Sequence, residues 1–146
     1  MVCQAMSEDL QARNAIKFLF WNLNRKPIWA LLSEIVSSRN PDLIILAECE
    51  EPTEAVAELN RHSSRLFHLT KTLGGKLELL SCLPEPCVVP VADYSGLSFR
   101  RVIPPLGKEI LLVGVHLPSK MFMSGEDQVM QCTTFAAKVK EVEEKV

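Results

Sequence analysis

The stretch that most constrains the fold is residues 42–50, DLIILAECE, where five apolar residues run directly into Glu48. A short apolar run that follows a proline and contains β-branched residues predicts a strand buried on both faces. A carboxylate at the end of such a strand must be solvated, paired with a cation or bound to a metal, because an unpaired buried charge is too costly. Glu48 is therefore the first candidate for a functional residue.

Strand and helix patterns alternate around this stretch. Residues 16–23 are apolar and aromatic and predict a strand, whereas residues 27–39 repeat apolar side chains at helical spacing and end before Asn40-Pro41. Strand, helix and strand joined by short turns form a βαβ unit with two parallel strands. A second helix is expected over residues 52–60.

The later part of the sequence predicts short strands and a final helix. The strands are expected at residues 66–70, 76–83, 87–91, 97–103 and 109–116, the last four as a meander of antiparallel neighbours. A serine at 124 with an acid at 127 is typical of a helix N-cap, and apolar residues then recur to the C-terminus.

One segment, residues 61–76, is locally basic. We interpret it as a solvated loop with an edge strand, and the alternative is a patch that faces phosphate.

Composition and charge limit the class of protein. The net charge of −2 gives no overall nucleic-acid signature, so any phosphate site would have to be local. No apolar run approaches the roughly 18 residues of a transmembrane helix, and no membrane contact is expected. Residues 1–15 lack the apolar core of a signal peptide and are expected to be a flexible leader. Five cysteines without a CxxC spacing predict reduced thiols and a cytoplasmic location, not a zinc site.

Three motifs stand in order at predicted strand ends: WNLN at 21–24, LAECE at 46–50 and VHLPS at 115–119. Together they resemble the endonuclease/exonuclease/phosphatase superfamily, the deoxyribonuclease I-like fold, over residues 16–128. The resemblance implies fold class α/β (α+β), with a mixed sheet and outer helices as half of a four-layer α/β-β/α sandwich. Residues 16–146 would be the N-terminal part of such a domain.

The resemblance also implies a chemistry, namely hydrolysis of phosphodiester or phosphomonoester bonds with Mg²⁺, or with Mn²⁺ in its place. Mg²⁺ prefers oxygen ligands and keeps several waters. Glu48 and Asn22 are therefore expected at the metal, and His116 is expected to contact the phosphate or the leaving group. The substrate would be a nucleic acid or another phosphate ester.

Each candidate residue also has a plainer interpretation. Asn22 alone could form a turn, Glu48 could be a paired surface acid, and His116 could be a hydrogen-bonded, half-buried histidine. Their joint order at strand ends favours the site.

The sequence departs from the family in its later motifs. Full members carry Gly-Asp-x-Asn and Ser-Asp-His motifs that complete the site. The aspartates here are Asp9, Asp42, Asp93 and Asp127; none follows Gly or Ser, and none precedes His. The C-terminal half is therefore expected to be absent and the chain alone to be weak or inactive. One inner sheet face would then be open to a second protein segment or to another copy of the chain.

Three hypotheses follow. The first is the N-terminal part of a Mg²⁺-dependent phosphoesterase or nuclease. The second is a non-catalytic interaction module that keeps the half-fold. The third is an unrelated small α/β protein, which would be favoured if Asn22, Glu48 and His116 lay far apart.

Overall fold

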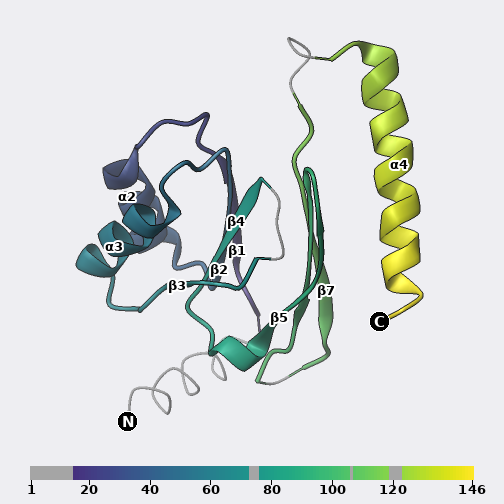
Figure 1. Cartoon of the computed structure of the whole chain (residues 1–146). Helices are drawn as coiled ribbons and strands as arrows, with labels where there is room; N and C mark the ends of the chain where they lie inside the picture. Colours follow the sequence, from purple (N-terminus) through teal and green to yellow (C-terminus); the bar gives the residue numbers. More distant parts are fainter. Residues whose placement is uncertain (1–14, 73–75, 106, 119–122) are drawn as a thin grey trace.

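The computed structural model describes residues 15–72, 76–105, 107–118 and 123–146 (Figure 1). The predicted leader at residues 1–15 lies outside the described residues except for Ala15. In chain order the elements are β1 (Phe18–Asn22), α2 (Trp29–Arg39), β2 (Leu43–Ala47), α3 (Pro52–His62), β3 (His68–Leu69), β4 (Leu77–Ser81), the 3-10 helix η1 (Glu85–Cys87), β5 (Val88–Tyr94), β6 (Leu97–Val102), β7 (Ile110–Val115) and α4 (Gly125–Glu143). Within these ranges no helix is both long enough and apolar enough to cross a membrane.

The first sheet has the strand order β1-β2-β4-β3. β1 and β2 are parallel and are joined by α2, which confirms the predicted βαβ unit, and the other pairs are antiparallel. All five residues of β2 are buried, as its continuous apolar run predicts. α2 and α3 cover one face of this sheet, so that β2 lies at the centre of the first core layer (Figure 1).

The second sheet is the antiparallel meander β5-β6-β7. The sequence predicts β4 as the first strand of this meander, and that prediction is wrong, because β4 pairs with β2 and β3 in the first sheet. Alternating apolar residues identify a strand but not its neighbour. The turn at Pro84 and the helix η1 carry the chain from one sheet to the other.

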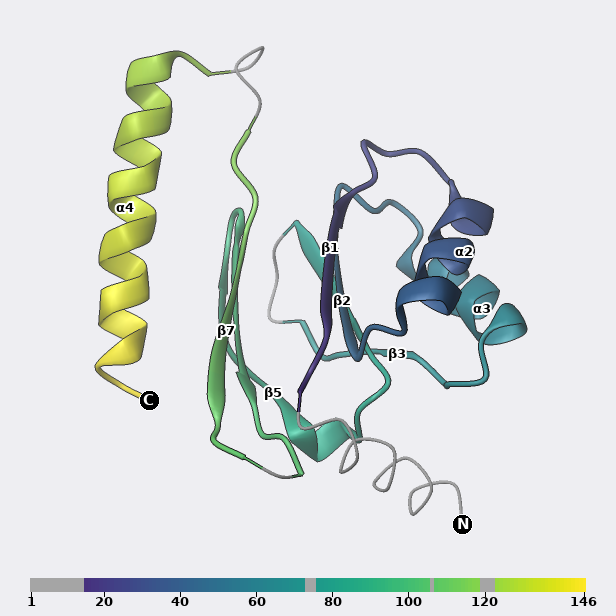
Figure 2. The same ribbon diagram turned by 180° about the vertical axis from the view of Figure 1, so that it is seen from behind.

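The elements form four layers: α2 and α3, the first sheet, the second sheet, and α4 (Figures 1 and 2). The inner faces of the two sheets pack on each other through Leu43, Ile45, Leu77, Leu79, Val88 and Val102. α4 covers the outer face of the second sheet through Phe135, Val139 and Val142. The sequence predicts that one inner sheet face is open. That prediction is wrong for the centre of the face, because this chain supplies strands to both sheets and they pack on each other there.

In the part of the chain that the structure describes, an exposed margin remains along β1, which is an edge strand of the first sheet. Leu19 and Trp21 point toward the helices and pack against the first core layer. Phe18 and Phe20 alternate with them, so they face the side of the second sheet, and they are 43% and 49% exposed. The apolar core between the two sheets is therefore continuous with an exposed apolar surface at the edge formed by β1.

Gly96, in the turn between β5 and β6, has a φ of +80° and lies against the end of β7. A Cβ at this position would lie 2.5 Å from the backbone oxygen of His116 and 3.2 Å from Phe135 Cζ. We expect Gly96→Ala to lower the free energy of unfolding by about 2 to 4 kcal/mol, because overpacking and a left-handed alanine add together. Urea unfolding would measure the loss. Gly125→Ala is the control, since nothing lies within 4 Å of its Cβ position, and an equal loss there would contradict the steric explanation.

Candidate active site

Three polar side chains meet where strands of both sheets end. Asn22 is the last residue of β1, Glu48 follows β2 directly, and His116 follows β7 directly. Asn22 Nδ2 lies 3.2 Å from Glu48 Oε1 and 3.3 Å from His116 Nε2, and His116 Nε2 lies 3.0 Å from Glu48 Oε1. The structure therefore brings the three sequence candidates together, and the wide separation expected of an unrelated protein is not observed.

The strand directions explain why these residues meet. β1 and β2 are parallel and in register from Phe18 and Leu43 to Asn22 and Ala47, so their carboxyl ends lie at one edge. The turn at Gly96 accepts a hydrogen bond of 2.8 Å from the backbone N–H of His116, which fixes the end of β7. The site is thus assembled by backbone pairing in both sheets.

Glu48 is the centre of this group. Its side chain is 28% exposed and that of His116 is 12% exposed, so a carboxylate and an imidazole share a partly desolvated space. An ionised carboxylate oxygen only accepts hydrogen bonds, so the 3.0 Å contact with Oε1 is a hydrogen bond in the tautomer that carries its proton on Nε2 of His116. In that tautomer the longer contact between Asn22 Nδ2 and Nε2 joins two donors.

The amide of Asn22 has a defined orientation. Its Oδ1 accepts a hydrogen bond of 2.8 Å from the backbone N–H of Asn24, and a backbone N–H can only donate. The amide nitrogen must therefore face Glu48 Oε1. In this arrangement Asn22 holds the carboxylate of Glu48 in place, and its own oxygen is turned toward the adjacent loop.

Backbone strain is concentrated at the site. Glu48 has a φ of +51°, and Asn24 and Arg25 in the facing loop have φ values of +49° and +58°. The two loops are joined by a hydrogen bond of 3.1 Å from the Arg25 N–H to the Glu48 carbonyl. Left-handed backbone costs on the order of 1–2 kcal/mol for residues other than glycine. Strain of this kind is often held at functional sites.

The strain at Glu48 predicts an unusual order of stabilities. We expect Glu48→Gly to be more stable to urea than Glu48→Ala by about 1 kcal/mol, because both variants lose the side chain and only glycine accepts a φ of +51° without cost. At the preceding strand residue Ala47, substitution by glycine should instead destabilise. Equal stabilities of the two Glu48 variants would show that the loop relaxes.

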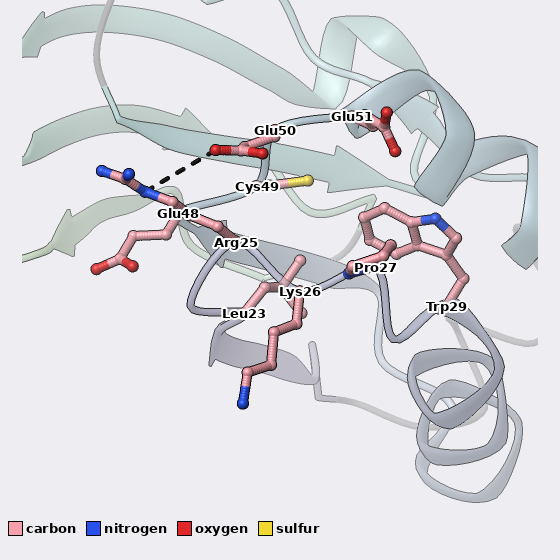
Figure 3. Close-up of a pocket in the computed structure, with 9 residues that line it drawn as sticks. All are labelled: Leu23, Arg25, Lys26, Pro27, Trp29, Glu48, Cys49, Glu50 and Glu51. Carbon is pink, nitrogen blue, oxygen red and sulfur yellow. Dashed lines mark ion pairs between the residues drawn. The ribbon is translucent and has the colours of Figure 1, made fainter.

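A cavity of about 150 Å³ opens beside Glu48, between the loops that follow β1 and β2 (Figure 3). Its lining comprises Leu23, Arg25, Lys26, Pro27, Trp29, Glu48, Cys49, Glu50 and Glu51. Arg25 points toward Glu50, at 3.9 Å, and Figure 3 marks this ion pair. Burial raises the pKa of the Cys49 thiol above its usual value, which favours the neutral thiol, and Cys49 packs against the first core layer.

The basic residues Arg25 and Lys26 were not singled out by the sequence motifs. The signal that could have identified them is their place between the strand-end Asn22 and the helix that begins near Pro27. The basic segment at 61–76 is different, because both of its arginines form ion pairs within the chain. Arg61 pairs with Glu58, which also contacts His62 Nε2 at 3.1 Å, and Arg65 pairs with the buried Asp42.

The described residues provide a limited set of metal ligands. In the part of the chain that the structure covers, no group of three or more His, Cys, Asp or Glu side chains could hold a metal ion. Zinc sites need such a group. Mg²⁺ is commonly held by one or two carboxylates with water and substrate phosphate, and Glu48 fits that pattern.

Comparison with known proteins gives a structural match without a sequence match. No model of a protein family matches the chain, and no curated protein matches it. A crystal structure of humanized D. rerio TDP2 with 14 mutations superimposes with a TM-score of 0.59 at 19% sequence identity. The match covers 86% of this chain and 56% of that chain, so the chain spans little more than half the length of this structure. The chain therefore has the endonuclease/exonuclease/phosphatase fold that TDP2 adopts, over a length consistent with its N-terminal half.

Proposed function

We propose that this chain carries the N-terminal part of the site of a metal-dependent phosphoesterase or nuclease, which hydrolyses phosphodiester or phosphomonoester bonds. The observation that carries the proposal is the convergence of Asn22, Glu48 and His116 within 3.3 Å of one another, from strands of both sheets. The likeness of the fold to TDP2 supports a nucleic acid or another phosphate ester as the substrate.

Glu48 would hold the metal ion, Mg²⁺ or Mn²⁺, and Asn22 would lie beside it. When bound, such an ion neutralises charge that develops on the phosphoryl oxygens. The amide nitrogen of Asn22 restrains Glu48 Oε1, so Asn22 orients the ligand. For Asn22 to ligate the ion through its own oxygen, the hydrogen bond from the Asn24 N–H would have to break.

His116 would contact the phosphate or the leaving group through Nε2, the atom that faces Glu48. In the tautomer that carries a proton on this nitrogen, Nε2 can donate a hydrogen bond to an anionic phosphoryl oxygen. The chain has no Gly-Asp-x-Asn or Ser-Asp-His sequence to orient the attacking water. Turnover by residues 1–146 alone is therefore expected to be slow.

The test combines metal binding with hydrolysis. Calorimetric titration with Mg²⁺ and with Mn²⁺ should give binding that is lost in Glu48→Gln, and a simple phosphodiester should be cleaved slowly in a reaction that EDTA stops. Equal metal binding by both proteins would rule out Glu48 as the ligand. Rapid turnover by the chain alone would contradict the incomplete site.

The margin at Phe18 and Phe20 favours a second candidate function, an interaction module. β7 is an edge strand of the second sheet, and its Gly114 lies over Ile45 and Leu77 of the first sheet. The edge of β7 that does not pair with β6 therefore lies on the same side of the two sheets as β1. An extended segment paired with that edge would cover both phenylalanines. The segment would come from further polypeptide or from a second copy of the chain.

Sedimentation velocity over a range of concentrations tests the second copy. Self-association should disappear in Phe18→Lys/Phe20→Lys and persist in Leu66→Lys, which alters an exposed leucine outside the margin, 62% exposed. Association that survives the double substitution would place the contact elsewhere.

A further inference from the structure

Another cavity, of about 370 Å³, opens between the two sheets. Its walls come from β3 and the two residues that follow it, and from η1 and the start of β5. We propose that this cavity, called the β3–β5 cavity below, binds a free α-amino acid with an aliphatic side chain, such as leucine. The proposal goes beyond the phosphoesterase function, because none of the lining residues belongs to the group formed by Asn22, Glu48 and His116.

The β3–β5 cavity lies away from the candidate active site. β3 is the edge strand opposite β1 in the first sheet, and β5 is an edge strand of the second sheet. His68 of β3 pairs with Ser81, and Ser81 pairs with Leu43 at the start of β2. Glu48, in contrast, follows the end of β2. A ligand in this cavity would therefore not compete with a substrate held at Glu48.

Two polar side chains of this cavity lack hydrogen-bond partners. Leu69 packs against the first core layer, so its neighbours His68 and Thr70 face the side of the second sheet. Nε2 of His68 and Oγ1 of Thr70 are buried, and neither forms a hydrogen bond with a described residue. Buried polar atoms are rarely left without a partner. Rotation about χ1 of Thr70, which is 7% exposed, would turn its hydroxyl toward a carboxylate in the cavity without moving the backbone.

The charges of the cavity have opposite signs and come from different elements. Lys71 lies two residues after β3, and Glu85 is the first residue of η1. Both residues are exposed, and neither forms an ion pair within the part of the chain that the structure describes. An ammonium group only donates hydrogen bonds and an ionised carboxylate only accepts them. A ligand with a carboxylate and an ammonium group on one carbon can satisfy both residues, whereas Glu85 would repel a simple anion such as phosphate.

The rest of the lining is largely aliphatic. Val88 is 5% exposed and belongs to the core between the sheets, and Val89 and Pro90 follow it on β5. The volume of about 370 Å³ is far larger than the roughly 30 Å³ that one water occupies, and it lies within the range of about 300–1,000 Å³ that is usual for small-molecule sites. Such sites combine apolar walls with a few polar groups that fix the orientation of the ligand. An aliphatic chain would therefore lie against the valines.

The test is an NMR titration of the ¹⁵N-labelled protein with L-leucine and with two analogues that each lack one charged group. Leucine should shift the backbone amide signals of Thr70, Lys71 and Val89 in a saturable manner. 4-Methylpentanoate has no ammonium group and 3-methylbutylamine has no carboxylate. Each analogue should bind at least about ten-fold more weakly than leucine, because it loses a charge-assisted hydrogen bond.

Two substitutions should act on different ligands. Lys71→Gln should weaken leucine binding about ten-fold and leave the binding of 3-methylbutylamine unchanged, because this amine has no carboxylate for Lys71 to contact. Glu85→Gln should weaken leucine binding by a similar factor and leave the binding of 4-methylpentanoate unchanged. A folding defect would weaken the binding of every ligand, so this crossed pattern separates recognition from damage.

The matched controls are Lys108→Gln and Glu54→Gln, which remove the same charges at exposed positions outside the cavity and should leave leucine binding unchanged. The absence of saturable shifts with leucine would overturn the proposal and indicate a cavity that holds water alone. Equal affinities for leucine and both analogues, or wild-type affinity in Lys71→Gln/Glu85→Gln, would also overturn it. Leucine binding by a protein that hydrolyses no phosphate ester would support the cavity while contradicting the phosphoesterase function.

Discussion

Replacing Arg100 with methionine should lower the free energy of unfolding by about 3 to 5 kcal/mol. Arg100 and Asp93 are 1% and 2% exposed and form a bidentate ion pair, with Nη1 to Oδ1 at 2.6 Å and Nη2 to Oδ2 at 3.0 Å. Methionine has a similar volume but no charge, so it leaves the Asp93 carboxylate buried without its guanidinium. The cost is the desolvation of that carboxylate and not a loss of packing.

Urea unfolding would measure this loss, and Arg101→Met is the control on the next residue of β6. Arg101 pairs with Glu109 at 3.2 Å with both side chains more than 40% exposed, so its replacement should cost under about 1 kcal/mol. Combining Arg100→Met with Asp93→Asn should recover part of the loss, since it removes the buried negative charge that has lost its guanidinium. A loss in Arg100→Met no greater than in Arg101→Met would contradict the buried-charge explanation.

The second large effect is on activity. Glu48→Gln should reduce metal-dependent hydrolysis by at least about a hundred-fold, equivalent to about 2.7 kcal/mol of transition-state stabilisation. Glutamine preserves the size of the side chain and its carbonyl can still accept from Asn22, but it removes the charge that would hold the ion. The measurement is the initial rate of phosphodiester cleavage at saturating metal.

Two controls accompany Glu48→Gln. Glu54→Gln removes an exposed carboxylate from the first turn of α3 and should retain full activity. Thermal unfolding of Glu48→Gln should resemble that of the wild-type protein, because the substitution leaves the backbone at φ +51° with a side chain of equal length. Undiminished hydrolysis in Glu48→Gln would remove Glu48 from the chemistry.

Much of the fold is readable from local pattern. The buried run that forms β2, the helical spacing of α2 and the capping box of Ser124 and Asp127 at the start of α4 are all signals within a few residues. The strand-end positions of Asn22, Glu48 and His116 follow from the same signals. Their roles in metal binding and catalysis stay predictions.

The features that the sequence did not predict depend on distant residues. Nothing near Leu77 indicates that β4 pairs with β2, and nothing near Asp93 indicates a buried partner seven residues later. The orientation of the Asn22 amide depends on the backbone of Asn24, whose φ of +49° is set by the loop. Such features follow from packing and loop geometry, which short-range periodicity does not encode.

The meeting of Asn22 and His116 has a consequence for folding kinetics. The two residues are 94 positions apart, so their contact closes a very long loop and forms only after both sheets have docked. The βαβ unit and the β5-β6-β7 meander each consist of nearer contacts and can form earlier. During refolding, the native environment of His116 should therefore be restored last. The NMR resonances of its imidazole would report when the native state is complete.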